Sequence, residues 1–254
     1  MNSNLIFTGK NSYTYNNFIK NSKLEMEISL NARKTLVLLG YKSPVSEQTN
    51  NIELYNYNFN RLYDQVTKFN LDKVDKLIFI SAISVYGSKW DGICKDVSPH
   101  KNDYYSLSKI KCENFLENFC CKNKIQFFTL RVPGIAGKKC VRNFLCNLNF
   151  KIKNNLEIFI KSPENKFNNV IYGEDLTKTI LKITNGNVTP GIYNLGASNP
   201  ISINDIVCIL CNKHNKKSIK IQINGVDHER IINISEFIEV FFMPESVRKI
   251  IDYI

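Results

Sequence analysis

A tyrosine and a lysine stand four residues apart in the segment DYYSLSKIKCE, residues 103–113. On a helix, residues at this spacing emerge from one face, so Tyr105 and Lys109 would lie one above the other. A phenol has a pKa of about 10 and is a poor base at neutral pH, but a nearby ammonium group favours the phenolate. The pair therefore indicates either proton transfer by Tyr105 or an ordinary amphipathic turn, and the spacing alone does not separate the two.

Alternating apolar strands and helices must position this pair. Continuous apolar runs suit strands that are buried on both faces of a parallel sheet, and they occupy residues 4–9, 34–40, 76–87 and 125–134. Helical spacing of apolar residues occurs at 52–69, 105–119, 143–155, 174–184 and 202–213, with a further strand at 191–196. This order predicts an α/β fold with a Rossmann-like parallel sheet flanked by helices and a small C-terminal substrate lobe. We expect the dinucleotide-binding core to span 1–135, and 136–254 to form mainly the lobe, interleaved with the core.

The composition narrows the class of protein. The 254 residues are 43% hydrophobic and contain no run near the roughly 20 apolar residues of a membrane span. The N-terminal apolar run is also too short for a signal peptide, so we expect a cytoplasmic protein without membrane contact. The net charge is +11, but the lysines are scattered and the densest run, 213–220, has no interleaved aromatic residue, which does not favour nucleic-acid binding.

The eight cysteines show no compact disulfide framework and suit reduced thiols. Cys208 and Cys211 are three apart on a predicted helix, where we expect core packing, because a zinc site would need two more ligands. We therefore expect no metal.

Six segments in order carry a family resemblance: FTG (7–9), FISAISVYG (79–87), YSLSK (105–109) followed by Glu113, TLRVPGIAG (129–137), FNNVIYGEDL (167–176) and GIYNLGASNPISINDI (191–206). This series resembles the extended short-chain dehydrogenase/reductase superfamily, specifically the NAD-dependent epimerase/dehydratase family that acts on nucleotide sugars. The resemblance covers nearly the whole chain. It implies NAD or NADP as cofactor and a nucleotide sugar as substrate, and it suggests a homodimer through helices that flank the sheet.

The resemblance also implies residue roles. Tyr105 would be the acid or base for a sugar hydroxyl, and Lys109 would lower its pKa and bond the nicotinamide ribose. The candidate cofactor-binding residues are Thr8, Gly9, Ser12, Tyr13, Gly40, Lys109 and Pro133. The candidate substrate-binding residues are Ser84, Tyr86, Arg142 and Asn143.

The phosphate loop departs from the family pattern of three glycines. Gly9 is kept, but Ser12 and Tyr15 stand in the second and third positions. Those glycines permit a tight turn and the close approach of backbone to pyrophosphate, so a tyrosine at the third position would occupy cofactor space. Residues 21–34 are also few for the two strands that the family fits there. Glu27 is a candidate for the acidic residue that reads the adenosine ribose, but we do not adopt it, which leaves NAD versus NADP open.

A second departure concerns the hydroxyl that normally bonds the reacting sugar oxygen, because Ala82 occupies its position. Ser84 lies two residues on and would face the same side of an extended segment, so it is the candidate third catalytic residue. The alternative is that Ser81 and Ser84 only bond the backbone of the turn.

The sequence thus predicts an NAD(P)-dependent epimerase or reductase of a nucleotide sugar. A dehydratase fits less well, because the family places an Asp-Glu pair where Ile83 and Ser84 stand. Two alternatives stay open: a catalytically impaired Rossmann-derived binding or scaffold protein, and an RNA-associated member of the superfamily.

Overall fold

A five-stranded parallel sheet organises the chain. The structure is a computed structural model that describes residues 5–8, 34–39, 52–69, 71, 74–87, 97, 99, 103–137, 143–216, 220–223, 225–226 and 228–254. The strands are β1 (Leu5–Phe7), β2 (Lys34–Leu38), β3 (Val74–Ala82), β4 (Gln126–Val132) and β9 (Gly191–Asn194), in the spatial order β1-β2-β3-β4-β9. Every neighbouring pair is parallel. The predicted Rossmann-like α/β class is confirmed.

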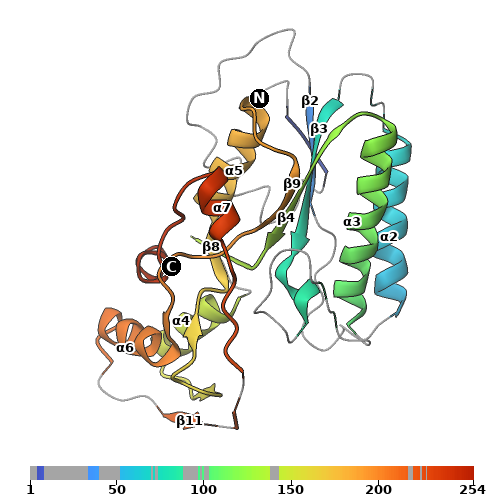
Figure 1. The fold of residues 1–254 in the computed structure, drawn as a ribbon. Coiled ribbons are helices and arrows are strands. Elements are labelled where there is room, and N and C mark those ends of the chain that lie inside the picture. Colours follow the sequence, from blue (N-terminus) through green and yellow to red (C-terminus); the bar gives the residue numbers. More distant parts are fainter. Residues whose placement is uncertain are drawn as a thin grey trace.

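Helices cover both faces of this sheet (Figure 1). On one face lie α2 (Ile52–Thr67) and α3 (Tyr104–Lys122), which pack side by side over a cluster that includes Leu36, Leu77 and Phe79. On the other lie α5 (Gly173–Asn185) and α7 (Ser235–Val240), over a cluster built on the alternate strand residues. Burial on both faces explains why these strands are continuous apolar runs in the sequence.

Two predicted strands end earlier than the sequence pattern indicates. The first ends at Ala82, and residues Ile83–Tyr86 form the short 3-10 helix η1, which a hydrogen bond from Gly87 N to Ser84 O closes. Gly87 has a φ of 60°, a value that glycine adopts without strain. The other ends at Val132, and Gly134 opens the separate strand β5 (Gly134–Ala136). Pro133 lies between the end of β4 and the start of β5, and it has no backbone N–H that could continue the hydrogen-bond ladder of the sheet.

A second lobe gathers around its own apolar cluster. It contains α4 (Phe144–Lys153), α6 (Ile203–Lys213) and α8 (Val247–Asp252), and it lies at the lower left of Figure 1. Short strands complete it as the pairs β5–β8, β6–β11 and β7–β10, with β6 (Ile158–Ile160), β7 (Lys166–Phe167), β8 (Val170–Tyr172), β10 (Ile201–Ser202) and β11 (Ile221–Ile223). The domain boundary at 135/136 stays a prediction.

The two cysteines of the C-x-x-C pair on α6 differ, because Cys211 packs against the apolar cluster of the second lobe and Cys208 does not. Cys208 is exposed and Cys211 is half-buried, so the expected core packing is wrong for Cys208. Helical periodicity places two residues three apart on one face but does not decide whether that face is covered. Within the described ranges, no helix has both the length and the apolar character that are needed to cross a membrane.

Candidate functional site

Tyr105 and Lys109 lie together on the first two turns of α3, beside the carboxyl end of β3. The helix begins here because Asp103 caps it, accepting a hydrogen bond from Ser106 N at 3.1 Å. Lys109 is only 4% exposed, and its Nζ donates to Ile80 O at 3.0 Å. The same Nζ lies 5.6 Å from the centre of the Tyr105 ring, which is half-buried.

Burial shifts the pKa values of both groups. It raises the pKa of Tyr105 to about 12, and the carboxylate of Asp103 adds to the rise. It lowers the pKa of Lys109 to about 8, against the opposing effects of Cys112 and Glu113. At neutral pH the Tyr105 phenol is therefore protonated, and Lys109 carries a positive charge that a modest rise in pH removes. The pair holds a proton donor next to a cation.

The serines near Ala82 contact side chains. Ser84 lies in η1, not in an extended segment, so the argument that it faces the same side as Ala82 does not hold. Its Oγ lies 2.8 Å from Ser106 Oγ, at the start of α3. Ser81 Oγ donates to Glu113 Oε1 at 2.5 Å. The alternative, in which both serines only bond turn backbone, is wrong as well. η1 nevertheless brings Ser84 to the helix that carries Tyr105.

The described residues include only part of the predicted cofactor site. Thr8 follows β1 at the carboxyl edge of the sheet, where its Oγ1 accepts from Leu39 N at 3.3 Å. Pro133 is half-buried between β4 and β5. Four further residues of the cofactor prediction lie outside the described residues: Gly9, Ser12, Tyr13 and Gly40; so do Tyr15 and Glu27.

The predicted substrate residues have structural partners. Tyr86 is 3% exposed, and its hydroxyl donates to Asn194 Oδ1 at 2.9 Å. Asn143 caps α4, since its Oδ1 accepts from Cys146 N at 2.8 Å and its Nδ2 donates to Ile135 O at 2.9 Å. Arg142 lies outside the described residues. Their roles in substrate binding stay predictions.

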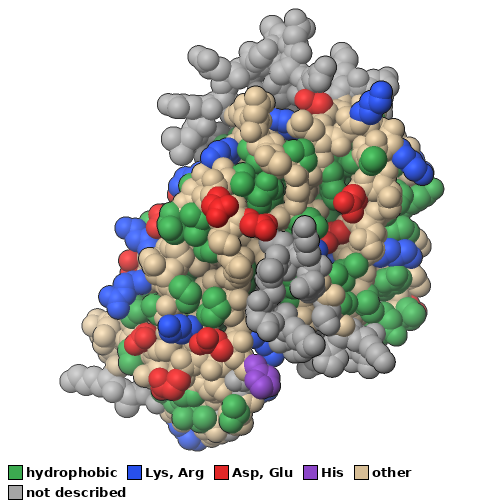
Figure 2. Space-filling view, in the orientation of Figure 1, with side chains coloured by type: hydrophobic (Ala, Val, Ile, Leu, Met, Phe, Trp, Pro, Cys, Tyr) green, Lys and Arg blue, Asp and Glu red, His purple; other side chains and the backbone are tan. Residues whose placement is uncertain are grey.

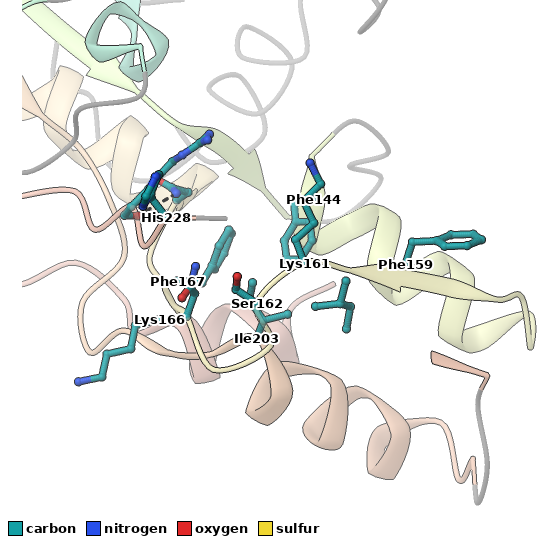
Figure 3. A pocket seen from close by; sticks show the side chains of 12 residues that line it. Phe144, Phe159, Lys161, Ser162, Lys166, Phe167, Ile203 and His228 are labelled. Atoms are coloured by element: carbon teal, nitrogen blue, oxygen red, sulfur yellow. Dashed lines mark hydrogen bonds between the residues drawn. The ribbon is translucent and has the colours of Figure 1, made fainter. Parts of the chain in front are cut away.

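A pocket of about 400 Å³ in the second lobe is absent from the sequence prediction. Figure 3 shows it between β6, β7, the start of α6 and the segment that holds His228, with the Lys166 side chain pointing away from the others. Its lining residues are Phe144, Phe159, Ile160, Lys161, Ser162, Asn165, Lys166, Phe167, Asn169, Ile203, His228 and Arg230.

This pocket combines aromatic and cationic side chains. Among the described residues that line it, none is acidic, whereas two lysines and Arg230 are cationic. The Asn169 Nδ2 donates to Arg230 O at 3.1 Å, while the buried Asn169 Oδ1 has no hydrogen-bond partner among the residues that the structure describes. A flat ligand with N–H donors and an anionic group fits such a lining. The lining residues come from distant segments, so only the Phe144 region, next to the predicted Asn143, could have been found from the sequence.

The fold and the Tyr–Lys pair define a Rossmann-like protein of the dehydrogenase/reductase type, and the comparisons give the family. Residues 18–196 match the NAD dependent epimerase/dehydratase family, and the chain belongs to that family. No curated protein sequence matches the chain.

Solved structures share the fold at low sequence identity. RMD from Pseudomonas aeruginosa complexed with NADPH is 12% identical, with a TM-score of 0.81 over 98% of this chain and 97% of that one. GDP-mannoheptose C4 reductase (MlghC) from Campylobacter jejuni with NADP bound is 13% identical, with a TM-score of 0.80 over 99% and 96%. UDP-N-acetylglucosamine 4-epimerase from Methanobrevibacter ruminantium M1, in complex with UDP-N-acetylmuramic acid, is 14% identical, with a TM-score of 0.78 over 99% and 98%.

Proposed function

We propose that this chain is a cytoplasmic NAD(P)-dependent reductase or epimerase of a nucleotide sugar, with Tyr105 as the acid/base. The observation that carries the proposal is the pair of the half-buried Tyr105 and the buried Lys109, beside the carboxyl end of a strand in a parallel sheet. Ligands of open α/β sheets bind at that edge. The family and the nucleotide-sugar and NAD(P) complexes among the structural neighbours support it, and they do not favour a scaffold without catalysis.

Lys109 fits a dinucleotide cofactor. An ammonium group has three N–H donors, and for Lys109 the structure gives one hydrogen bond, to Ile80 O. A buried cation with donors to spare suits the hydroxyls of a ribose. Lys109 would hold the cofactor there, with Thr8 at the same edge of the sheet. The bound cofactor supplies hydride transfer.

Tyr105 would move the proton. Because its pKa is raised to about 12, the phenol is protonated at neutral pH and can donate to the carbonyl oxygen of a keto sugar as that carbon is reduced. The Lys109 ammonium, 5.6 Å from the ring centre, stabilises the phenolate that remains. Ser84 would bond the same sugar oxygen. The reduction direction therefore suits this pair better than direct proton abstraction.

The pocket in the second lobe would hold the nucleotide. Lys161 and Arg230 suit a diphosphate, and the aromatic side chains suit a base. The unpartnered Asn169 Oδ1 would accept a hydrogen bond from a base N–H. This assignment rests on residues that the sequence alone did not place together.

We also propose a homodimer through α2 and α3. Tyr57 and Tyr63 on α2 are 43% and 47% exposed, and Tyr63 lies 5.3 Å from Phe115 of α3, ring centre to ring centre. Figure 2 shows hydrophobic side chains over this flank of the molecule. Covering them with a second copy would remove apolar surface from water.

A matched pair of tyrosine variants tests the function. NADH and NADPH are titrated by fluorescence, and turnover is measured with keto and hydroxyl forms of UDP- and GDP-sugars. Tyr105→Phe should abolish turnover and leave cofactor binding intact, whereas Tyr104→Phe, at the neighbouring position, should keep turnover. Unchanged turnover in Tyr105→Phe would exclude Tyr105 as the acid/base, and failure to bind either cofactor at millimolar concentration would favour the scaffold alternative.

A further inference from the structure

Five buried polar side chains from five elements form one hydrogen-bonded network. They are Ser81 of β3, Tyr86 of η1, Glu113 of α3, Arg131 of β4 and Asn194 of β9, and each is at most 5% exposed. Among the described residues, Arg131 and Glu113 form an ion pair whose side chains are both less than 10% exposed. These residues lie up to 113 positions apart in the sequence, from Ser81 to Asn194.

Arg131 is the hub of this network. Its Nε and Nη2 donate to the two carboxylate oxygens of Glu113, at 3.2 and 2.7 Å. Its Nη1 donates to the Tyr86 hydroxyl at 2.8 Å, and the guanidinium carbon lies 5.1 Å from the centre of the same ring. A guanidinium is a rigid planar fork, so it fixes the direction of both partners at once.

The two arms end at the two segments of the proposed site. Glu113 lies one helical turn after Lys109 on α3, and Tyr86 ends the short helix that carries Ser84. The Tyr86 hydroxyl also donates a hydrogen bond to Asn194 Oδ1 at 2.9 Å, which extends the network to β9. Arg131 therefore links the segment with the candidate substrate hydroxyl to the helix with the acid/base.

Stability alone is a poor reason for such a network. Removing two opposite charges from water is costly, and well-packed apolar residues of similar volume are often at least as stabilising as a buried ion pair. The planar guanidinium of Arg131 adds a defined geometry between the elements that it joins, η1 and α3. In addition, η1 has no side-chain cap at its start, and the described polar contacts of two of its side chains fix it: the Tyr86 hydroxyl bonds Arg131 and Asn194, and the Ser84 hydroxyl accepts from Ser106.

We propose that Arg131 is a positioning residue, which acts through Tyr86 to set η1 and Ser84 at a fixed distance from Tyr105 and Lys109. This inference rests on the proposed function, and it assigns to Arg131, Tyr86 and Asn194 a role without substrate contact. A displacement of about 1 Å at a reacting centre is enough to lower a rate by roughly a hundredfold.

Two variants that each delete one buried hydroxyl test this role. Tyr86→Phe breaks the arm to η1, whereas Ser81→Ala removes the Ser81 bond to Glu113 and leaves both arms of Arg131 intact. In the full chain, Tyr86→Phe should lower kcat by roughly tenfold to a hundredfold. Ser81→Ala should stay within about twofold, although its urea unfolding midpoint should also fall, because it loses one buried hydrogen bond, whereas Tyr86→Phe loses two, to Arg131 and to Asn194. Equal kcat losses in the two variants would overturn the proposal.

A double variant separates positioning from direct contact. Arg131→Lys keeps the charge that faces Glu113 but cannot fork to Tyr86. If Tyr86 acts through Arg131, Arg131→Lys combined with Tyr86→Phe should lower kcat no further than the larger single loss. Multiplied losses would mean that Tyr86 acts independently, and they would refute the role of Arg131.

A readout without turnover keeps the two proposals distinguishable. Amide hydrogen exchange is measured over residues 83–87 in the unaltered protein, Tyr86→Phe and Ser81→Ala. Tyr86→Phe should exchange faster there, whereas Ser81→Ala should not. Unchanged exchange in Tyr86→Phe overturns the positioning role whether or not the protein turns over a nucleotide sugar. Altered exchange in a protein without turnover refutes only the proposed function.

Discussion

The buried lysine of the site should make the protein less stable at neutral pH. Burial lowers the pKa of Lys109 to about 8 from its ordinary value of 10.5. At about 1.4 kcal/mol per pKa unit, the charged form destabilises the folded state by about 3 kcal/mol near pH 7. Because the folded pKa is the lower one, the unfolded chain binds more protons between about pH 8 and 10.5, and stability rises with pH across that window. Lys109→Met, which has a similar volume, removes this dependence.

The change with pH is the quantity to measure, since the substitution also removes the pH-independent bond to Ile80 O. Relative to Lys109→Met, the unaltered protein should gain about 2 kcal/mol between about pH 7 and pH 9.5, from the same two pKa values. Urea unfolding of both proteins at the two pH values gives the difference between their free energies of unfolding. The alkaline titration of Tyr105 and Cys112 occurs in both proteins and largely cancels in this difference. Lys122→Met, at an exposed position in the last turn of the same helix, is the control and should show no such gain.

A pH-independent difference would refute this reasoning, because it would mean that the pKa of Lys109 is the same in the folded and the unfolded protein, as for a solvated side chain. The argument that Lys109 is a buried cation with donors to spare for the cofactor would then lose its physical basis. A decrease with rising pH would show that Lys109 gains a favourable partner on folding, which is the opposite of what its burial predicts.

Three further outcomes follow from the site and its surroundings. In titration calorimetry, Arg230→Ala should weaken UDP or GDP binding by about 1.5–3 kcal/mol, which is the range for a hydrogen bond to a charged group. The control Lys178→Ala, at an exposed lysine of α5, should leave the affinity unchanged. An unchanged affinity in Arg230→Ala would place the nucleotide elsewhere. Raising the pH through about 8 should weaken NAD(P)H binding as Lys109 loses its charge, and a flat pH profile of the dissociation constant would contradict the contact between Lys109 and the cofactor. Tyr63→Glu should convert a dimer to a monomer in sedimentation experiments, and an unchanged dimer would exclude the α2/α3 interface.

The elements of the main sheet could be predicted because their burial is symmetric. β2, β3 and β4 are covered on both faces, so each is a continuous apolar run, and α2, which lies between β2 and β3 in the chain, carries the periodicity of an amphipathic helix. The same logic fails at η1. Ile83 and Val85 are β-branched and buried, which is typical of a continuing strand. In the fold, however, they pack beside Ile232, which lies 149 positions after Ile83 in the sequence. A contact that distant overrides local preference.

The candidate site could be predicted only where one helix carries both of its groups. Tyr105 and Lys109 are neighbours on α3, so their spacing places them together before any tertiary contact is known. Arg131 and Asn194 carry no such local signal. Each is a polar residue in an apolar strand, which indicates a buried partner without naming it. The nucleotide pocket is harder still, because Phe144, Phe167 and Arg230 meet only when the second lobe forms.

The site and the network place three charges in the interior, on Lys109, Glu113 and Arg131, within a protein whose stability rests on apolar packing. Glu113 and Arg131 neutralise each other, whereas among the described residues the Lys109 Nζ has one hydrogen bond, to the carbonyl of Ile80, and lies over the rings of Phe79 and Tyr105. The difference between the paired charges of Glu113 and Arg131 and the charge of Lys109 bears on their roles. A pair that only held the fold together would be replaceable by apolar residues, and a lone buried ammonium is destabilising until a polar ligand reaches it. Cofactor binding should therefore stabilise the protein more at pH 7 than at pH 9.5, and a thermal shift with NADPH that is equal at both values would contradict the pairing of Lys109 with the cofactor.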